Sequence, residues 1–221
     1  MSHNEAATTS LAESPVSIYD RFTKLYDLMF RFNGYGRSIE HYLRETPLPL
    51  PPGSRILDAG CGTGLLTLAL LRVLRRPAEI TAVDLSGRSL QTARRAVRKL
   101  AADPRHSVAF VRADALSLPF PEDSFDLVVT SGVLEYLPLR EGLGEMARVL
   151  APGGHLLFLP VRPSPATRLL EIMFRFKAHP PREVADATQS LFSVVEHYRF
   201  PPLEPIGWTK SLVLAQKQSG V

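Results

Sequence analysis

The sequence predicts an α/β fold: a doubly wound, Rossmann-like sheet of seven mostly parallel strands with helices on both faces. A strand-type stretch at residues 55–57 runs through a glycine-rich turn into an apolar stretch of helical length at residues 65–74. Strand-type and helix-type segments then alternate along the rest of the chain. Such alternation places parallel strands in one sheet and the connecting helices on its two faces. The 221 residues are enough for one domain of this kind with a substantial core.

The chain before the glycine-rich turn carries two predicted helices. Residues 1–14 are polar and are expected to form a disordered tail. Residues 15–32 carry apolar side chains at three- and four-residue intervals, which predicts an amphipathic helix. Asn-Gly-Tyr-Gly then interrupts the pattern, residues 37–46 have the pattern of a second helix, and a proline-rich stretch leads into the first strand. We therefore expect a helical lid and linker over residues 15–53, ahead of a ligand-binding domain over residues 54–221.

The start of the second helix after the turn is marked by its capping residue. Ser86 precedes a helical pattern at residues 88–101, and a serine side chain accepts a hydrogen bond from the first helical turn. Ala-Pro-Gly-Gly at residues 151–154 is typical of a turn that closes a helix. The remaining helices are expected at residues 141–150, 165–177 and 181–189. The remaining strands are expected at residues 79–85, 107–114, 125–130, 155–161, 192–200 and 208–216.

Composition and charge narrow the class of protein. The formal charge of +4 is mildly basic, which permits contact with anionic partners without establishing it. The single cysteine, Cys61, rules out an internal disulfide, and the six histidines lack metal-ligand spacing, so no metal site is expected. No run reaches the about 18 apolar residues of a membrane span, and the first residues lack the apolar core of a signal peptide. These features favour a cytoplasmic protein, and they are compatible with contact at a membrane surface.

The glycines of the turn help to decide between two kinds of nucleotide site. Gly60, Gly62 and Gly64 have the spacing G-x-G-x-G, whereas a dinucleotide site has the spacing G-x-G-x-x-G. The third glycine of that second spacing would fall at Leu65. A glycine turn ahead of a helix lets the backbone approach a ligand and offers it free N–H groups. Within the turn, Cys61 fills a position that needs a small side chain, and a structural role is favoured for it over a reactive thiol.

Three acidic residues lie at or near the ends of the first three predicted strands. These are Asp58, Asp84 and Asp114, and ligands of open α/β sheets bind at the carboxyl ends of the strands. Asp84 follows Gly64 by about 20 residues, the spacing at which an acid accepts hydrogen bonds from ribose hydroxyls. The same spacing occurs in dinucleotide enzymes, so it does not by itself distinguish the two kinds of site.

Five segments together resemble the class I S-adenosylmethionine (SAM) methyltransferases of the type 11 group. These segments are ILDAGCGTG, AVDLS, ADALSLPFPEDSFDLVV, SGVLEYL and RVLAPGGHLLFL, and they cover roughly residues 55–160 without a gap. The resemblance implies that SAM is the cofactor and that the glycines of the turn line its methionine part. The residues implied in cofactor binding are Asp58, Gly60, Cys61, Gly62, Gly64, Asp84, Leu85, Asp114, Ala115 and Ser131.

The same resemblance implies a role for several of these side chains. Asp58 would orient the glycine loop and the amino group of SAM, and Asp84 would hold the ribose. Asp114 and Ala115 would hold the adenine, and Ser131 would lie near the methionine and the sulfonium. A lone aspartate near a strand end is also a common helix cap or turn former, but three of them in this arrangement favour a shared ligand.

The resemblance implies fewer residues for binding the methyl acceptor than for binding the cofactor. Tyr19 and Tyr26, each followed by an aspartate, are similar to the entry segment of quinone and phospholipid methyltransferases, where it covers the cofactor pocket as a lid. A helix that only packs on the sheet explains this segment equally well. No catalytic base is assigned, because this chain has Glu135 and Tyr136 where many relatives carry a histidine. Glu135 could act as a base or contact the substrate, but we slightly favour a solvated helix residue.

The predicted function is transfer of a methyl group from SAM to a small or lipid-like acceptor, such as a quinone precursor, a phospholipid or another small molecule. Residues 168–177 mix apolar and basic side chains, which is typical of a helix on an anionic bilayer and also of a helix that covers a sheet. Nucleic acid is disfavoured because the basic residues are spread out. Two alternatives are open: a SAM-binding assembly or regulatory protein without catalysis, and, less favoured, an NAD-dependent oxidoreductase.

Overall fold

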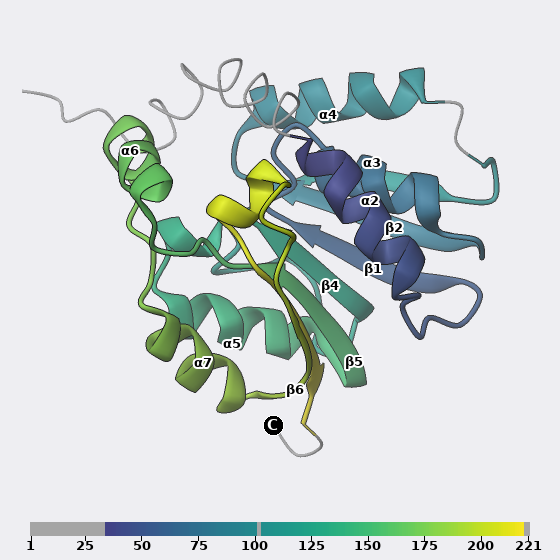
Figure 1. Cartoon of the computed structure of the whole chain (residues 1–221). Coiled ribbons are helices and arrows are strands. Elements are labelled where there is room, and N and C mark those ends of the chain that lie inside the picture. Colours follow the sequence, from purple (N-terminus) through teal and green to yellow (C-terminus); the bar gives the residue numbers. More distant parts are fainter. Residues whose placement is uncertain (1–33, 101–102, 219–221) are drawn as a thin grey trace, which may run out of the picture.

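One seven-stranded sheet forms the centre of the molecule (Figure 1). The computed structural model describes residues 34–100 and 103–218. The strand order is β3-β2-β1-β4-β5-β7-β6, and all neighbours are parallel except at β7, which runs antiparallel to β5 and β6. The predicted seven-stranded, mostly parallel sheet is therefore confirmed. The strands are β1 (Ser54–Ala59), β2 (Ala78–Asp84), β3 (Ser107–Arg112), β4 (Phe125–Ser131), β5 (Leu150–Leu159), β6 (Phe192–Tyr198) and β7 (Leu212–Lys217).

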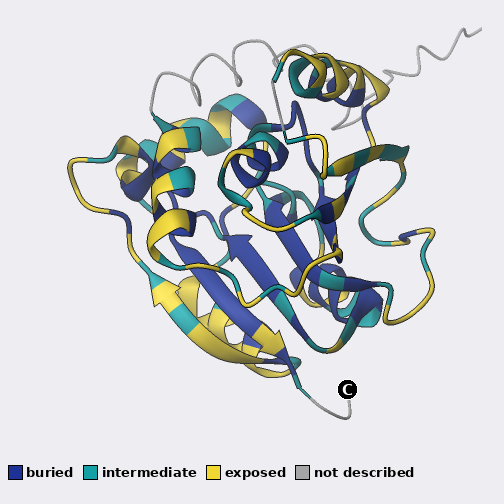
Figure 2. Cartoon of the chain, turned by 90° about the vertical axis from the view of Figure 1, so that its right-hand side faces the viewer, coloured by how far each residue is buried: buried dark blue, intermediate teal, exposed yellow. Residues whose placement is uncertain are grey.

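Helices cover both faces of the sheet, and the central strands are buried between them (Figure 2). Alternate side chains of one strand therefore enter two separate cores. Ile56 of β1 packs with α2 and α3, whereas its neighbour Leu57 packs with α5 and α7. The helices are α2 (Tyr35–Glu45), α3 (Leu65–Val73), α4 (Gly87–Lys99), α5 (Leu139–Val149), α6 (Pro165–Phe174) and α7 (Pro181–Gln189), with 3₁₀ helices η1 (Leu134–Tyr136) and η2 (Pro205–Trp208).

The order of the strands reverses at β1, which lies between β2 and β4. From β1 the chain passes through α3 to β2 and then through α4 to β3, and both of these strands lie on one side of β1. The next strands along the chain, β4 and β5, lie on the other side of β1. In open α/β sheets, ligands bind at the carboxyl ends of the strands next to such a reversal. The glycine-rich turn follows directly from β1, so it lies at this position.

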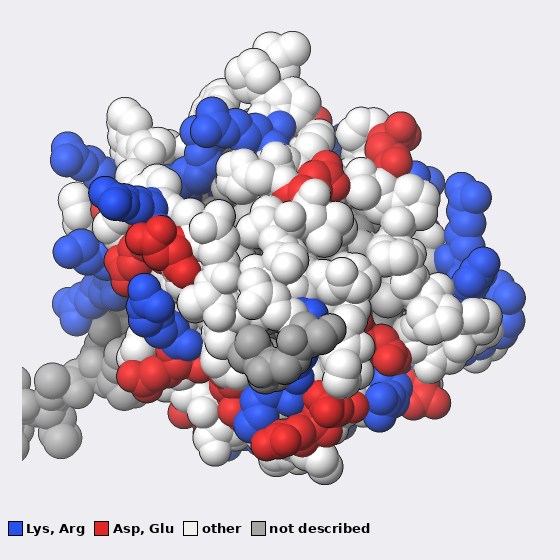
Figure 3. Space-filling view, turned by 90° about the horizontal axis from the view of Figure 1, so that it is seen from below, with Lys and Arg blue, Asp and Glu red and all other residues white. Residues whose placement is uncertain are grey.

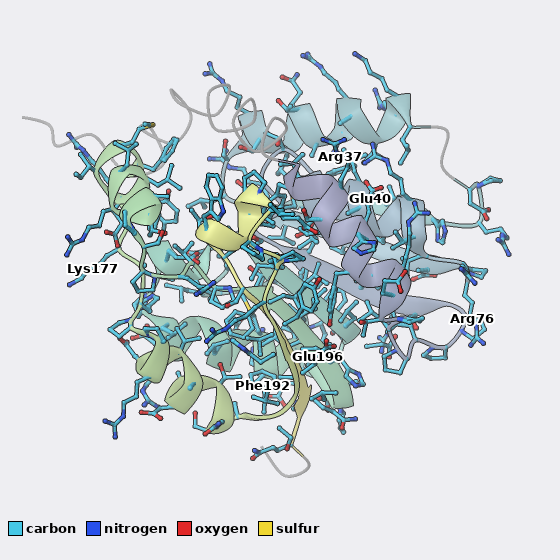
Figure 4. All side chains as sticks on the ribbon, in the orientation of Figure 1. Arg37, Glu40, Arg76, Lys177, Phe192 and Glu196 are labelled. Atoms are coloured by element: carbon cyan, nitrogen blue, oxygen red, sulfur yellow. The ribbon has the colours of Figure 1, made fainter. Side chains whose placement is uncertain are left out.

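Helix α2 is anchored in the domain. The predicted helix at residues 37–46 is confirmed, with a start two residues earlier at Tyr35. Glu40 of α2 pairs with the Arg72 guanidinium of α3 at 2.7 Å, and the Tyr42 hydroxyl donates to Glu196 of β6 at 2.9 Å (Figure 4 labels both acids). These contacts, together with the buried apolar face of α2, make this helix part of the folded core. The helix predicted at residues 15–32 lies outside the described residues.

The start predicted for the fifth strand is wrong. β5 begins at Leu150, directly after α5, whereas the sequence predicts a turn at residues 151–154. Leu150 pairs with Phe125, and a shift in the register of β4 and β5 follows that pair. A Cβ on Gly154 would lie 3.2 Å from the backbone oxygen of Asp126, so the glycine permits close pairing here. The Pro-Gly-Gly stretch is thus part of an irregular strand rather than a turn.

Two further boundaries differ from the sequence prediction by three residues or more. The last strand begins at Leu212, because residues 205–208 form η2 instead, and the Trp208 indole donates there to the Pro202 carbonyl at 2.9 Å. Helix α6 ends at Phe174 rather than at residue 177, because Arg175 adopts a left-handed conformation with φ 53°. In contrast, α7 occupies the predicted residues, and Ser86 caps α4 as predicted by accepting from Ser89 N at 3.2 Å.

On the face seen from below, charged side chains surround an uncharged centre (Figure 3). Basic and acidic side chains are mixed at the left and at the bottom of this view, and Lys and Arg side chains lie together at its right-hand edge. Within residues 34–100 and 103–218, no helix is both long enough and apolar enough to cross a membrane.

Candidate functional site

A cavity lies at the carboxyl ends of β1, β2 and β4, where the strand order reverses. The glycine-rich turn, the segment after β3 and the turn between β4 and η1 form its walls. Of the ten residues predicted to bind a cofactor, all line the cavity except Gly64. The lining residues are Tyr35, Asp58, Gly60, Cys61, Gly62, Thr63, Leu65, Leu66, Val83, Asp84, Leu85, Ser86, Ala113, Asp114, Ala115, Ser131, Gly132, Val133, Tyr136 and Leu137.

Two glycines of the turn are required by their surroundings. Gly60 has a φ of 72°, and a Cβ there would lie 1.9 Å from Cγ2 of Val133. Gly64 has a φ of 90°, and a Cβ there would lie 3.0 Å from the Cβ of Ala93 in α4. A side chain at either position would therefore meet both backbone strain and a steric clash. Gly64 faces α4 and allows α3 to begin close to it, which explains why it does not line the cavity.

The carboxylate of Asp58 is buried, and only one of its two oxygens accepts a hydrogen bond from the described residues. Its side chain is 1% exposed, and Oδ2 accepts a hydrogen bond from the Thr67 hydroxyl of α3. Oδ1 has no hydrogen-bond partner among the described residues. Burial raises the pKa of Asp58 to about 7, a rise opposed by the hydrogen bond from Thr67 and increased by the charge of Asp84. A cationic ligand group, such as an ammonium, would satisfy Oδ1 and stabilise the ionised carboxylate.

Asp84 connects the cavity to the backbone of two loops. It ends β2, and its Oδ2 accepts from Gly62 N while its Oδ1 accepts from Ser86 N, both at 2.8 Å. Asp84 therefore holds the glycine-rich turn in place in addition to lining the cavity. A carboxylate oxygen has two lone pairs, so an oxygen that accepts a backbone N–H can also accept a hydroxyl of a ligand.

Asp114, Ala115 and Leu85 form the outer side of the cavity. Asp114 lies two residues beyond the end of β3 and is exposed, and its Oδ1 accepts from Leu116 N at 2.9 Å. Leu85 is exposed beside Asp84. This side combines an exposed carboxylate with apolar surface, which suits a flat ligand group that carries a hydrogen-bond donor.

Tyr35 is a cavity residue that the sequence reasoning missed. It lies in the first turn of α2, and its buried hydroxyl donates to the hydroxyl of Ser131 at the end of β4. Burial, and the charges of Asp58 and Glu135, raise the pKa of Tyr35 above its usual range, so it remains a neutral donor. The sequence shows Tyr35 only as part of a helix-breaking segment, and nothing in the pattern places it opposite β4.

The prediction that Glu135 is a solvated helix residue is wrong. Glu135 lies in η1 and is 8% exposed, and its Oε1 accepts from Val161 N at 2.8 Å. Its Oε2 has no partner among the described residues. Glu135 does not line the main cavity but lines two small voids beside it, both of which share Gly132 with the main cavity. The short 3₁₀ turn that buries it has no periodic signal in the sequence.

The remaining predicted residues add no reactive group to the cavity. Burial first, and then the charges of Asp58 and Asp84, raise the pKa of Cys61, so its thiol stays protonated and a poor nucleophile. In the part of the chain that the structure describes, no group of three or more His, Cys, Asp or Glu side chains could hold a metal ion. Tyr19 and Tyr26, predicted as substrate residues, lie outside the described residues.

Taken together, the cavity fits a ligand with three different parts. A cationic group fits Oδ1 of Asp58, hydroxyl groups fit Asp84, and a flat donor-bearing group fits the side formed by Leu85 and Asp114. The first N–H groups of α3 lack intrahelical partners, and they favour a fourth part of the ligand, an anionic group. An amino acid joined to a nucleoside contains all of these parts.

Comparison with known proteins agrees with this ligand chemistry. A family model described as a methyltransferase domain matches residues 57–158. A demethylmenaquinone methyltransferase of Thermus thermophilus is 36% identical over 67% of this chain and 66% of its own length. A 27-O-demethylrifamycin SV methyltransferase of Amycolatopsis mediterranei is 33% identical over 85% of this chain and 72% of its own length.

A solved structure shares the fold at low sequence identity. It is a geranyl diphosphate methyltransferase in complex with SAM, with a TM-score of 0.67 and 19% identity over 83% of this chain and 90% of that chain. The chain spans 66% of the Thermus relative but only 55% of a demethylmenaquinone methyltransferase of Clavibacter sepedonicus, so parts of some relatives have no counterpart in it.

Proposed function

We propose that this chain, which belongs to the class I SAM-dependent methyltransferases, transfers the methyl group of SAM to a small or lipid-like acceptor. The observation that carries the proposal is Oδ1 of Asp58, a buried oxygen without a partner among the described residues at the base of a glycine-lined cavity. Leaving a buried acceptor unpaired costs about 1–3 kcal/mol, and a ligand ammonium removes that cost.

The residues of the cavity fit the parts of SAM one by one. Asp58 would receive the amino group of the methionine part, and the start of α3 would receive its carboxylate. Asp84 would accept the ribose hydroxyls while it holds Gly62 in place. Asp114 would accept the adenine amino group, with Ala115 and Leu85 beside the ring.

Bound SAM supplies a methyl group that is already activated for transfer to a nucleophile. The task of this chain is therefore to hold the acceptor in line with that methyl group and to exclude water. Tyr35 and Ser131 form a neutral hydrogen-bonded pair in the wall of the cavity, which Tyr136 and Leu137 also line. These side chains border the position at which we place the transfer.

The acceptor is proposed to be a small molecule with a large apolar part. The names of three relatives refer to demethylmenaquinone, demethylrifamycin SV and fatty acids. On the side of the cavity that faces α6, apolar side chains line a small adjoining void. These are Leu170, Phe174 and Phe176, which line the void together with Tyr136. An apolar acceptor would bury these side chains further, whereas a highly charged one would lose its hydration there.

Helix α6 is proposed to bring the protein to an anionic lipid surface that holds such acceptors. Leu169 and Ile172 are 61% and 80% exposed on this helix. The basic residues Arg168, Arg175 and Lys177 are exposed on and just after α6, and Lys177 points away from the domain in Figure 4. Exposed apolar side chains flanked by positive charges are typical of helices that lie at a lipid surface.

The proposed function is tested by cofactor titration followed by turnover. The full chain should bind SAM and should not bind NAD in calorimetric titrations. With methyl-labelled SAM and a panel of quinols, fatty acids and phenols, it should form labelled product and S-adenosylhomocysteine in equal amounts. Absence of SAM binding would refute the proposal, and SAM binding without turnover on any acceptor or cell extract would favour a binding protein without catalysis.

A further inference from the structure

Two charged side chains are buried beside the cofactor cavity without matching partners. Oε2 of Glu135 has no partner within the described residues. Lys210, between η2 and β7, is 2% exposed, and its ammonium group donates to the Leu159 carbonyl at 3.3 Å. An ammonium has three donors, so this single long bond leaves Lys210 poorly satisfied within the described chain.

The backbone brings the two side chains to the same place. Val161 follows β5, pairs with Lys210 in an isolated antiparallel bridge, and donates its N–H to Oε1 of Glu135. Glu135 and Lys210 both line one small void, whose other walls include Gly132 and Tyr136. Gly132 and Tyr136 also line the cofactor cavity, so the void adjoins that cavity directly.

The two side chains do not form a salt bridge that would explain their burial. No ion pair of 4.0 Å or less joins Glu135 to Lys210, both of which lie within the described residues. Burial lowers the pKa of Lys210, and the charge of Glu135 only partly opposes that change. Burial of charged groups without full pairing is destabilising, so such groups cluster where a ligand is bound.

We infer that Glu135 and Lys210 form a subsite for a hydroxyl group of the methyl acceptor, which rests on the function proposed above. A hydroxyl is both a donor and an acceptor, so one group can donate to Oε2 of Glu135 and accept from Nζ of Lys210. A carboxylate only accepts hydrogen bonds, so it would satisfy Lys210 but repel Glu135. A hydroxyl of the acceptor can therefore complete both side chains, whereas a carboxylate cannot.

The body of the acceptor is inferred from the apolar walls of the void. Leu170 and Phe174 of α6 and the following Phe176 line it, and the ring of Phe176 lies 5.7 Å from the ring of Tyr136. The void is large enough for a hydroxyl but too small for a ring, so a ring would stack on these side chains only after the void opens toward the cofactor cavity. The ligand class is thus an apolar, preferably aromatic molecule with a phenol- or enol-type hydroxyl.

Entry of such a molecule requires the α6 region to shift. Only Thr167 and Phe174 of α6 are buried, so few of its side chains hold it against the domain. Displacement of Phe176 and Phe174 would join the small void to the cofactor cavity through Gly132 and Tyr136. The acceptor would then lie between the cofactor and the Glu135–Lys210 subsite.

Three related probes test the subsite by direct binding to the full chain loaded with saturating S-adenosylhomocysteine, at about pH 6, where 4-nitrophenol keeps the hydroxyl proton that it would donate to Glu135. They are 4-nitrophenol, nitrobenzene, which lacks the hydroxyl, and 4-nitrobenzoate, which carries a carboxylate instead. We expect 4-nitrophenol to bind at least about tenfold more tightly than either of the others in calorimetric titrations, from its two hydrogen bonds to charged groups. Lys210→Met and Glu135→Gln should each remove most of this preference and leave nitrobenzene binding within about twofold.

Lys217→Met is the matched control, because Lys217 is the other lysine among the described residues whose side chain is buried. It lies at the far end of β7, and its ammonium donates to Asp123 at 2.9 Å and to the Leu150 carbonyl at 2.7 Å, so two of its three donors are paired. Loss of this lysine should reduce thermal stability and leave the preference for 4-nitrophenol unchanged. Circular dichroism and S-adenosylhomocysteine affinity identify any variant that does not fold, and Glu135→Gln retains an oxygen for Val161 N.

The inference is overturned if 4-nitrophenol binds no more tightly than nitrobenzene, if 4-nitrobenzoate is preferred, or if both variants keep the preference. It is also overturned if none of the probes binds while S-adenosylhomocysteine does. In that last case the proposed cofactor site stands, because failure of the proposed function would appear as absence of cofactor binding itself.

Discussion

At the scale of single residues, the proposed role of Asp58 predicts that cofactor binding depends on pH. Burial raises the pKa of Asp58 from 3.8 to about 7. Between these two pH values, Asp58 is therefore protonated in the folded chain and ionised in the unfolded chain. The stability contributed by protonated Asp58 is fully present below pH 3.8 and is lost as the pH rises through about 7. Binding of the SAM ammonium requires the ionised carboxylate, so its affinity should rise over the upper part of the same range.

We therefore predict SAM binding that is weaker at pH 6 than at pH 8 by about threefold to tenfold, because one pH unit below the pKa leaves about a tenth of the carboxylate ionised, which outweighs the partial loss of the SAM ammonium charge at pH 8. Calorimetric titration at both pH values measures the difference. Asp58→Asn, which keeps an oxygen for Thr67, should bind SAM weakly at both pH values and show little pH dependence. Equal affinity of the unaltered chain at the two pH values would contradict the assigned role of Asp58.

Gly60 and Gly87 provide a matched test of the turn. Gly60→Ala should reduce SAM affinity at least about tenfold, because its left-handed conformation costs alanine about 1–2 kcal/mol and its Cβ would clash with Val133. Gly87 begins α4 and is exposed, and a Cβ there would meet no atom within 4 Å, so Gly87→Ala should change stability by no more than about 0.5 kcal/mol. Thermal unfolding and SAM titration of both variants give the comparison, and similar behaviour of the two would refute the steric argument.

Asp84 and Asp114 should differ in how they affect the fold. Asp84→Ala removes the acceptors for Gly62 N and Ser86 N, so it should lower the free energy of unfolding by about 1–3 kcal/mol and weaken SAM binding at least about tenfold. Asp114→Ala, at an exposed position with one local hydrogen bond, should weaken SAM binding with little loss of stability. Denaturant unfolding and SAM titration separate these effects. Unchanged stability in Asp84→Ala would show that the carboxylate does not hold the turn.

At the scale of elements, α6 is the part of the described chain best suited to meet a lipid surface. Replacing Leu169 and Ile172 together by glutamate should reduce binding to vesicles that contain anionic lipid at least about tenfold, since each buried side chain of this size contributes about 1.5–3 kcal/mol. Val194 and Val195 are exposed on β6 and serve as the control pair for the same replacement. Vesicle sedimentation measures both, and equal loss from the two pairs would argue against α6 as the contact.

The segment ahead of α2 is predicted to influence turnover more than folding. Deletion of residues 1–32 retains Tyr35 and the buried face of α2, so the truncated chain should fold and still bind SAM weakly. Methyl transfer should slow at least about tenfold, a loss of about 1.4 kcal/mol in transition-state stabilisation, because the proposed lid with Tyr19 and Tyr26 is removed. Circular dichroism, SAM titration and turnover test this. An unfolded product would indicate a helix of the core, and full activity would leave the segment without a role in the site.

At the scale of the whole molecule, the sequence is informative wherever local chemistry determines structure. The glycine spacing, the strand-end acids and the Ser86 cap each follow from a local requirement, and the structure brings Asp58, Asp84 and Asp114 to one cavity. The predicted start of β5 is wrong because pairing of Leu150 with Phe125 overrides the turn-like Pro-Gly-Gly.

The rest of the site depends on contacts between distant parts of the chain. Tyr35 meets Ser131 across 96 positions, and Glu135 is buried by Val161 and the segment before β7. No periodic pattern reports such contacts, because each residue lies in or next to a short turn whose side-chain directions are set by tertiary packing. Lys210, which lies between Thr209 and Ser211 in the sequence, gains significance only when Leu159 and Glu135 are beside it.

The central claim is that the cavity at the reversal of strand order binds SAM through the glycine turn and its acids. Calorimetric titration of the full chain with SAM at pH 8 tests it most directly, in parallel with Gly60→Ala and with NAD as the competing cofactor. The account predicts one SAM bound per chain, at least about tenfold weaker binding in Gly60→Ala, and no heat of binding with NAD. Absence of SAM binding, or SAM binding unchanged in a folded Gly60→Ala variant, would contradict it.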